Sequence, residues 1–412
     1  MSLEGPIAAG LIGRLGDPVH MLAGFGVGFS IAFFIESAVI GLLATSTALA
    51  VNRQHYLLIR KFVIYLMFIT TALVAGIAFS PIYEVLAMKV IGVSQGISDA
   101  GRPALVAFIP FSAGVAWRRY TQGILIRNGQ PRFMALGTVV RTVSLFICGI
   151  VFLSIGTVPG ATAAAISISA SVVAEALFTH FLARPIIRKV YDSPEQKLTE
   201  PLSLRALLQF HIPLSLSSVM WLLAKPMVQG AIARGEKPDT SLAAWEPAGN
   251  MLFVFRAPAS ALPEAVITLQ RDEQTENALK WFCIKVGLVT TAFLAVFAFS
   301  PAGLWFIRVP LQVPIESQTI CLHAMQAFCF APMVNSLQSY YRGMLSFHRV
   351  TNAQFLAMTV YVGTSFMVLF MLVKVGQMNV VNASIALTVA MLLEALVLGY
   401  SFSRLKHFSK QA

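Results

Sequence analysis

Charged residues are scarce in this sequence of 412 residues. Asp, Glu, Lys and Arg make up 12% of it, whereas hydrophobic residues make up 57%. Soluble globular domains carry about twice that charged fraction. The apolar runs are each about 20 residues or longer, the length that a helix needs to cross roughly 30 Å of hydrocarbon. The ten-residue alternation of a membrane barrel is absent, so we expect an all-α integral membrane protein.

Acidic residues are fewer than basic ones, with 18 Asp and Glu against 30 Lys and Arg. A net charge of +12 suits a nucleic-acid partner. However, most of the basic residues fall in loops that we place on one side of the membrane, among them Arg53, Arg60, Arg184 and Arg188. This asymmetry is the positive-inside signature. We therefore expect no nucleic-acid partner, and a multi-pass protein of the cell (inner) membrane with its C-terminus in the cytoplasm.

Cysteine is also rare, and its four copies lie inside apolar runs without metal-ligand spacing. We expect free thiols, no disulfide and no metal site. Gly-rich phosphate loops, clusters of His with carboxylates and Ser-His-Asp sets are absent as well. These absences predict that the protein is not an enzyme and needs no cofactor.

The two halves of the chain resemble each other at an offset of about 220 residues. The triplet Phe79-Ser80-Pro81 matches Phe299-Ser300-Pro301, and Tyr120, Gly123 and Leu125 match Tyr340, Gly343 and Leu345. Internal repetition of this kind is common among membrane transporters. It predicts two pseudo-symmetric lobes in a parallel repeat, 1–183 and 206–412, joined by a polar cytoplasmic linker at 184–205.

Each lobe is expected to hold six helices. We place those of the first lobe at 5–14, 21–50, 62–79, 103–126, 133–155 and 160–182. Those of the second are placed at 206–234, 241–270, 281–306, 320–345, 354–373 and 381–402. Subtraction of 220 puts the start of the first helix before residue 1. The first helix is therefore expected to be incomplete at its N-terminal end.

Two of these segments carry a recognisable pattern. The first has Val19, Met21-Leu22-Ala23, Phe25-Gly26, Ser30 and Phe33-Phe34, and the second has Phe108, Pro110-Phe111, Ala116-Trp117 and Gly123-Ile124-Leu125. Pro213-Leu214, Pro226, Phe328, Pro332 and Gly343 add a weaker match. With these residues the chain resembles the progressive ankylosis protein family. That family is a branch of the multidrug/oligosaccharidyl-lipid/polysaccharide flippase (MOP) superfamily, which also contains the multidrug and toxin extrusion (MATE) transporters.

The resemblance implies a secondary transporter with a central cleft between two lobes and alternating access. It implies export, with pyrophosphate, nucleotides and citrate as the substrates of the animal ankylosis proteins. Without an ATPase domain, uphill transport would use an ion gradient, and H⁺ or Na⁺ is a possible coupling ion. We expect a small-molecule substrate, the lipid bilayer as surroundings and a monomer.

Charged side chains inside a spanning helix are costly and mark candidate sites. Glu36 and Arg256 stand at equivalent repeat positions. We hypothesise that they bind substrate and pair as a gate between the lobes; the alternative is that each bonds within its own lobe. Lys225 is a further candidate for binding an anion, or for pairing with Glu246 or Glu264. Glu246 and Glu36 are candidate carriers of the coupling ion.

Secondary candidates lie nearer the ends of the helices. They are His211, which we interpret first as a packing residue, and Arg119, Tyr120, Tyr340 and Arg342. Adjacent arginines point about 100° apart, so only one of Arg118 and Arg119 can face the cleft squarely. For Glu175 we expect a role in lobe packing, with Arg141 as its partner.

Alternative functions stay open. A drug or cation extrusion antiporter would want a negative, aromatic-rich cleft, and a lipid-linked sugar flippase would carry more arginines. A membrane-embedded enzyme lacks a catalytic constellation, and the incomplete first helix is compatible with a degenerate protein that does not transport.

Overall fold

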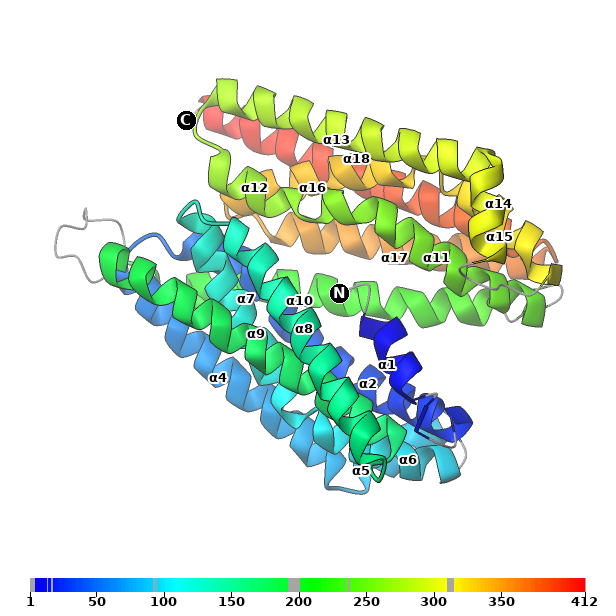
Figure 1. Cartoon of the computed structure of the whole chain (residues 1–412). Helices are drawn as coiled ribbons and strands as arrows, with labels where there is room; N and C mark the ends of the chain where they lie inside the picture. The colour runs from blue at the N-terminus through cyan, green and yellow to red at the C-terminus, as the bar shows by residue number, and fades with distance from the viewer. Residues whose placement is uncertain are drawn as a thin grey trace. The chain divides into compact units, whose positions relative to one another are not determined.

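The computed structural model describes residues 4–12, 14–15, 18–91, 93, 95–191, 201–232, 234–235, 238–309 and 315–411, which form helices and the turns between them (Figure 1). No strand occurs in these residues. The chain divides into two compact units, Met1–His211 and Ile212–Ala412. The all-helical fold with two lobes is confirmed.

The helices of the first unit are α1 (Glu4–Ile12), α2 (Pro18–Ile40), α3 (Leu42–Leu49), α4 (Arg53–Ala78), α5 (Ile82–Glu84), the π-helix η1 (Val85–Ile91), α6 (Gln95–Ala107), α7 (Ile109–Arg127), α8 (Arg132–Ile155) and α9 (Gly160–Tyr191). Helix α10 (Leu204–Ile232) begins in the first unit and continues into the second. The second unit continues with α11 (Pro238–Ser260), α12 (Leu262–Leu269), α13 (Glu273–Phe299), α14 (Pro301–Arg308), α15 (Ile315–Ala327), α16 (Ala331–Phe347), α17 (Asn352–Lys374) and α18 (Val380–Gln411).

The repeat holds at the level of whole helices. Helices α2, α3 and α6 begin and end 220 residues before α11, α12 and α15, and the same is true of α8 with α17 and α9 with α18. Helix α1 also ends 220 residues before α10, but it has nine residues where α10 has 29. The duplication and the short first helix are therefore confirmed.

In the part of the chain that the structure describes, nine helices are long and apolar enough to cross a membrane. The count is ten if α15 and α16, which meet at a bend of 43°, form one span. Two of the twelve expected spans are outside this set. Helix α1 is too short, and the pair α6 and α7 is polar because α7 carries adjacent arginines.

Three expected helices are broken where the second segment has proline at its start. Helices α7, α12 and α16 each have Pro in their first turn, at Pro110, Pro263 and Pro332. Proline lacks the N–H that would continue the ladder of the preceding helix. Continuous helices at 103–126, 241–270 and 320–345 were therefore wrong predictions, although the prolines that explain the breaks are visible in the sequence.

The start of α4 was also predicted wrongly, at residue 62. The helix begins at Arg53, and the Asn52 side chain accepts a hydrogen bond from the His55 backbone N–H at its N-cap. Arg53, Arg60 and Lys61 had been excluded as too polar for a membrane span. A spanning helix can extend past the hydrocarbon, where capping and not apolarity decides its end.

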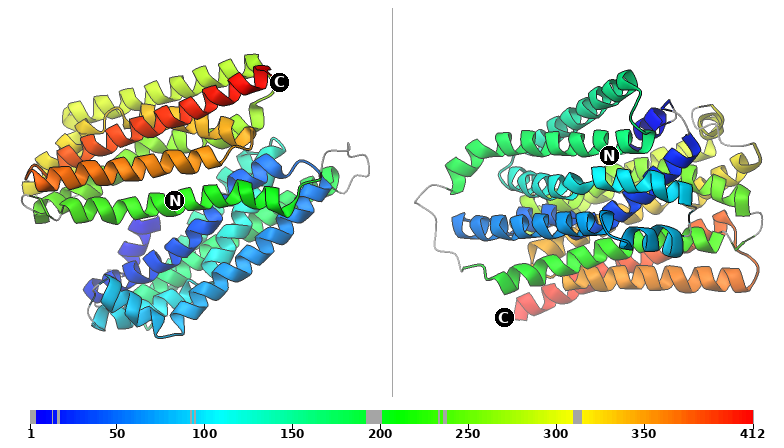
Figure 2. Two further views of the ribbon diagram at one scale, coloured as in Figure 1. Left: turned by 180° about the vertical axis from the view of Figure 1, so that it is seen from behind. Right: turned by 90° about the horizontal axis from the view of Figure 1, so that it is seen from below.

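Helices differ in how much of their apolar surface is covered. Only 17% of the apolar window of α8 is buried within the protein, against 61% for α9. The two helices pack side by side, as do α17 and α18 in the second unit (Figures 1 and 2). Helix α9 is thus an inner helix of its unit, and α8 presents an apolar outer face suited to lipid.

A glycine permits the closest helix crossing in each unit. A Cβ on Gly123 of α7 would lie 2.7 Å from the Leu43 carbonyl oxygen of α3. Its repeat partner Gly343 of α16 would place a Cβ 2.9 Å from the Pro263 carbonyl oxygen of α12. Both distances are too short for any side chain, so the repeated glycine fixes the approach of α7 to α3 and of α16 to α12.

Candidate functional site

Glu175 of α9 is the centre of a buried polar cluster in the first unit. It is fully buried and accepts hydrogen bonds from Arg118 Nη1 at 3.2 Å and Gln122 Nε2 at 3.1 Å, both on α7. Arg141 Nη1 of α8 lies 3.6 Å from the same carboxylate. The contact between Glu175 and Arg141 is the expected one. It joins three helices through one carboxylate, as buried charges in a membrane require.

The second unit contains the corresponding cluster around Glu394 of α18. Gln338 Nε2 of α16 donates to Glu394 at 2.9 Å, and Arg342 forms an ion pair with the same carboxylate. By the repeat offset, Gln338 stands where Arg118 does, and Arg342 where Gln122 does. The arginine and the glutamine have exchanged places one helical turn apart, and both pairs still reach the glutamate.

Arg141 also reaches the start of the described chain. Its Nη2 lies 2.6 Å from Glu4 Oε2 of α1, and the guanidinium is buried. Helix α1 is therefore tied to α8 by an ion pair, and through Arg141 to the cluster around Glu175. The second unit lacks this link, because Tyr361 and Ala224 occupy the equivalent positions.

Glu36 of α2 is buried beside this cluster, with 1% of its surface exposed. The positive charges that act on it are those of Arg119, Arg118 and Arg141. Its Oε2 atom has no hydrogen-bond partner among the described residues. A buried carboxylate oxygen without a donor is unfavourable as an anion, so it can accept a proton or a small cation.

Arg256 of α11 occupies the same repeat position in the second unit with the opposite charge. Its Nη2 donates to Asn335 Oδ1 of α16 at 2.9 Å, and it lies within electrostatic range of Glu394 and Arg342. Its Nε is buried and has no acceptor in the part of the chain that the structure describes. The second cluster therefore has two guanidiniums around one carboxylate, and one N–H donor that protein acceptors leave unused.

His211 packs the start of α10 against the break between α2 and α3. Its Nε2 lies 3.1 Å from the Ala38 carbonyl oxygen, and its Nδ1 lies 2.9 Å from Thr45 Oγ1. A carbonyl only accepts, so a neutral imidazole carries its proton on Nε2 and accepts at Nδ1 from the Thr45 hydroxyl. Both ring nitrogens are thus occupied by protein groups, as expected of a packing residue.

The other candidates are distributed between the two units. Tyr120 and Tyr340 are each 1% exposed, and Tyr120 stacks on Tyr56 with ring centroids 6.1 Å apart. The side chains of Lys225 and Glu246 lie outside the described residues. Glu36 and Arg256 belong to different units, so their pairing stays a prediction.

The described residues contain no group of three or more His, Cys, Asp or Glu side chains able to hold a metal ion. Four free thiols are present, at Cys148, Cys283, Cys321 and Cys329, as expected.

No protein-family model matches this sequence, and no curated protein is significantly similar to it. Solved structures, in contrast, match it over nearly its whole length. A MOP superfamily transporter from Pyrococcus furiosus, described as having a binding pocket of reverse polarity that suggests a different function, has a TM-score of 0.77 at 15% identity, over 98% of this chain and 92% of that one.

This chain has the fold of a MATE transporter. A multidrug resistance MATE family transporter in its outward-facing conformation gives a TM-score of 0.76 at 15% identity, over 98% of this chain and 92% of that one. The Vibrio cholerae MATE transporter VcmN in the bent form gives 0.74 at 16% identity, over the same shares. At these identities the likeness concerns the fold.

Gln122 and Asn335 are the cluster residues that sequence analysis missed. A signal for Gln122 existed, since it is the repeat equivalent of Arg342, which was a candidate. Asn335 has no comparable signal, because it is an uncharged residue of α16 whose contact with Arg256 depends on how α11 and α16 pack.

Proposed function

We propose that this protein is a secondary transporter of the MOP superfamily, in the branch similar to the progressive ankylosis proteins. It moves small organic or phosphate-bearing anions out of the cell by alternating access. The MATE fold over nearly the whole chain supports a transporter, and the pattern of helices α2 and α7 supports the branch.

One observation carries the choice of an anion: a buried arginine with an unused donor. Arg256 bonds Asn335 through Nη2 and has its Nε free of any acceptor in the described part of the chain. A carboxylate or phosphate oxygen is the ligand that such a guanidinium binds best. One solved structure of this fold is described as having reverse pocket polarity, so the fold accommodates pockets of different sign.

Glu36 is our candidate for the coupling site, with a proton as the coupling ion. Its Oε2 lacks a donor, and three arginines lie within electrostatic range. Those arginines make a second cation such as Na⁺ unfavourable, whereas a proton simply neutralises the carboxylate. Proton binding at Glu36 would release Arg119 and Arg118 from its charge and change the balance of the cluster around Glu175.

Extrusion of drugs or other organic cations is the second candidate. It is favoured by the solved structures of this fold that are described as multidrug transporters. The charge at position 256 argues against it, because a cation would meet Arg256 and Arg342 near the one carboxylate of Glu394.

The test is the anion content of the medium around cells that express the chain. Citrate, pyrophosphate or nucleotides should rise with the parent and not with Arg256→Gln or an empty vector. Glu36→Gln should keep binding but abolish the dependence on a proton gradient. If no anion rises although the protein is inserted in the membrane, while an added fluorescent cation is extruded, the second candidate replaces the first.

A further inference from the structure

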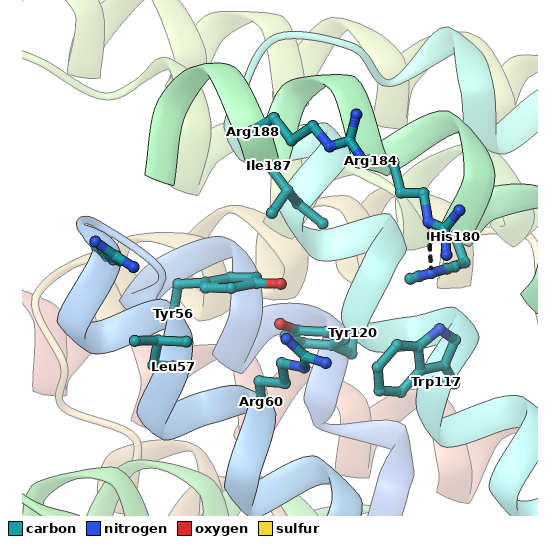
Figure 3. A pocket seen from close by; sticks show the side chains of 10 residues that line it. Tyr56, Leu57, Arg60, Trp117, Tyr120, His180, Arg184, Ile187 and Arg188 are labelled. Carbon is teal, nitrogen blue, oxygen red and sulfur yellow. Dashed lines mark hydrogen bonds between the residues drawn. The ribbon is translucent and has the colours of Figure 1, made fainter. Parts of the chain in front are cut away.

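A cavity of about 460 Å³ lies in the first unit where α4, α7 and α9 meet (Figure 3). We call it the arginine pocket, because its lining includes four arginines: Arg53 and Arg60 from α4, and Arg184 and Arg188 from α9. It is distinct from the clusters around Glu175 and Glu394, and the proposed transport function does not use it.

Aromatic rings form the inner wall of the arginine pocket. Tyr56 stacks on Tyr120 at 6.1 Å between centroids, and Trp117 lies 5.4 Å from both Tyr120 and His180. Tyr56 and Tyr120 are almost completely buried. Figure 3 shows their hydroxyl groups pointing into the space between Arg60 below and the arginines of α9 above. The pocket thus has a rigid wall with hydroxyl groups, flanked on two sides by guanidiniums.

The pattern of the lining residues follows the helical repeat. On α4 the arginines stand seven residues apart with Tyr56 between them, and on α9 Arg184 and Arg188 stand four residues apart. Residues at these spacings share one face of a helix. Each helix therefore turns a basic face towards the same cavity.

None of the described residues that line the pocket is acidic. The only printed polar contact between lining side chains is the bond from Arg184 Nε to His180 Nε2, at 3.2 Å. Arginine stays charged at all physiological pH values, so four guanidiniums around one cavity repel each other. An anion with several oxygens would relieve this repulsion and meet the planar donors of more than one arginine.

The second unit provides an internal comparison. Positive charge at the cytoplasmic ends of helices is common, and that explanation alone predicts the same residues in both units. Instead, Glu273 and Glu276 stand at the positions of Arg53 and Tyr56, while Lys280 and Arg404 keep the charge of Arg60 and Arg184. Glu276 also forms an ion pair with Lys406 at 2.5 Å. The second unit neutralises this region with its own carboxylates, and the first does not.

We propose that the arginine pocket binds a phosphate group. Arg53 begins α4, and the apolar span of α9 ends at Lys189, so the pocket lies at the end of both spans. This is the level of lipid headgroups, and basic pockets between spanning helices hold anionic headgroups there. The same site is also open to a soluble phosphate compound. The two sources share one chemistry, and an experiment with two arms separates them.

The first arm titrates inorganic pyrophosphate into the purified protein in a neutral detergent and measures binding by calorimetry. The second places the protein in nanodiscs of phosphatidylcholine with and without cardiolipin, and measures retained cardiolipin by native mass spectrometry. Both arms compare the parent with Arg60→Gln/Arg188→Gln. The matched control is Lys280→Gln/Arg404→Gln, which removes two exposed positive charges at the corresponding end of the second unit.

Binding in at least one arm should weaken about tenfold or more in Arg60→Gln/Arg188→Gln and stay near the parent value in the control. Loss confined to the lipid arm identifies a headgroup, and loss in the pyrophosphate arm identifies a soluble ligand. The proposal is overturned if the parent binds neither probe, or if both double variants lose equally. All four arginines are exposed at their tips, and the single variants Arg60→Gln and Arg188→Gln repeat the test if the double variant does not fold.

Discussion

At the residue scale, the two copies hold an equivalent glutamate in different ways. Arg118 and Gln122 bond Glu175, whereas Gln338 and Arg342 bond Glu394. Residues four apart on a helix lie on one face, so either order can bring both donors to the carboxylate. The requirement is one charged and one neutral donor on that face of α7 or α16, and not a particular order.

This interpretation predicts that the first copy tolerates the order found in the second. Arg118→Gln alone should destabilise the protein by about 2 kcal/mol, since a buried carboxylate loses its closest charge but keeps Gln122 and Arg141. The double variant Arg118→Gln/Gln122→Arg should regain most of this loss. Thermal unfolding of both variants in detergent measures it, and a double variant no more stable than Arg118→Gln would contradict the interpretation.

At the element scale, glycine and cap residues recur at the same repeat positions. Gly123 and Gly343 set the crossings of α7 with α3 and of α16 with α12. Asn52 and Asp272 cap α4 and α13, each through a backbone N–H three residues on. The repeat therefore preserves how helices start and cross, while the charged residues in the units have diverged.

Gly123→Ala should lower stability by roughly 1–3 kcal/mol, because its Cβ would lie 2.6 Å from Ser46 Cβ and must push α3 away from α7. Gly76→Ala in α4 is the matched control, since its Cβ meets nothing within 4 Å. Melting temperatures of the two variants decide this. Equal effects at both glycines would show that helix propensity matters here and the close crossing does not.

The cap of α13 should make stability depend on pH. Hydrogen bonds from the Thr275 hydroxyl and backbone N–H hold the pKa of Asp272 below its usual 3.8. A carboxyl with a depressed folded-state pKa contributes stability above its unfolded pKa, and this contribution is lost as the pH falls through the folded value.

Asp272→Asn reproduces the cap residue of α4 without a titrating group. The difference in melting temperature between the parent and this variant should therefore shrink as the pH is lowered from neutral towards 3. A difference that stays constant over this range would show that the charge of Asp272 does not act on the cap.

At the scale of the whole molecule, the repeat made most of the architecture predictable. Matches such as Phe79-Ser80-Pro81 with Phe299-Ser300-Pro301 gave the offset that the helix bounds follow. The breaks at α7, α12 and α16 were missed although their prolines are visible, because apolarity alone was used to set the helix limits. The charged extension of α4 was missed for the same reason.

The candidate sites were less predictable than the fold. Hydropathy singled out Glu36 and Arg256 as charges inside spanning helices, but the contact of Arg256 with Asn335 depends on the packing of α11 against α16. The arginine pocket was hidden because its arginines read as loop charges of one membrane side. Only the packing of α4 and α9 shows that they surround one cavity with Tyr56 and Tyr120.

The measurement that tests the central claim most directly is uptake of radiolabelled pyrophosphate and citrate by proteoliposomes containing the purified chain. The parent should accumulate an anion, Arg256→Gln should reduce uptake at least tenfold, and Arg256→Glu should abolish it by placing the charge of Glu36 at the equivalent position. Uptake by both variants at the parent rate would contradict an anion site at Arg256. Uptake of an organic cation, and of no anion, would contradict the anion transporter itself.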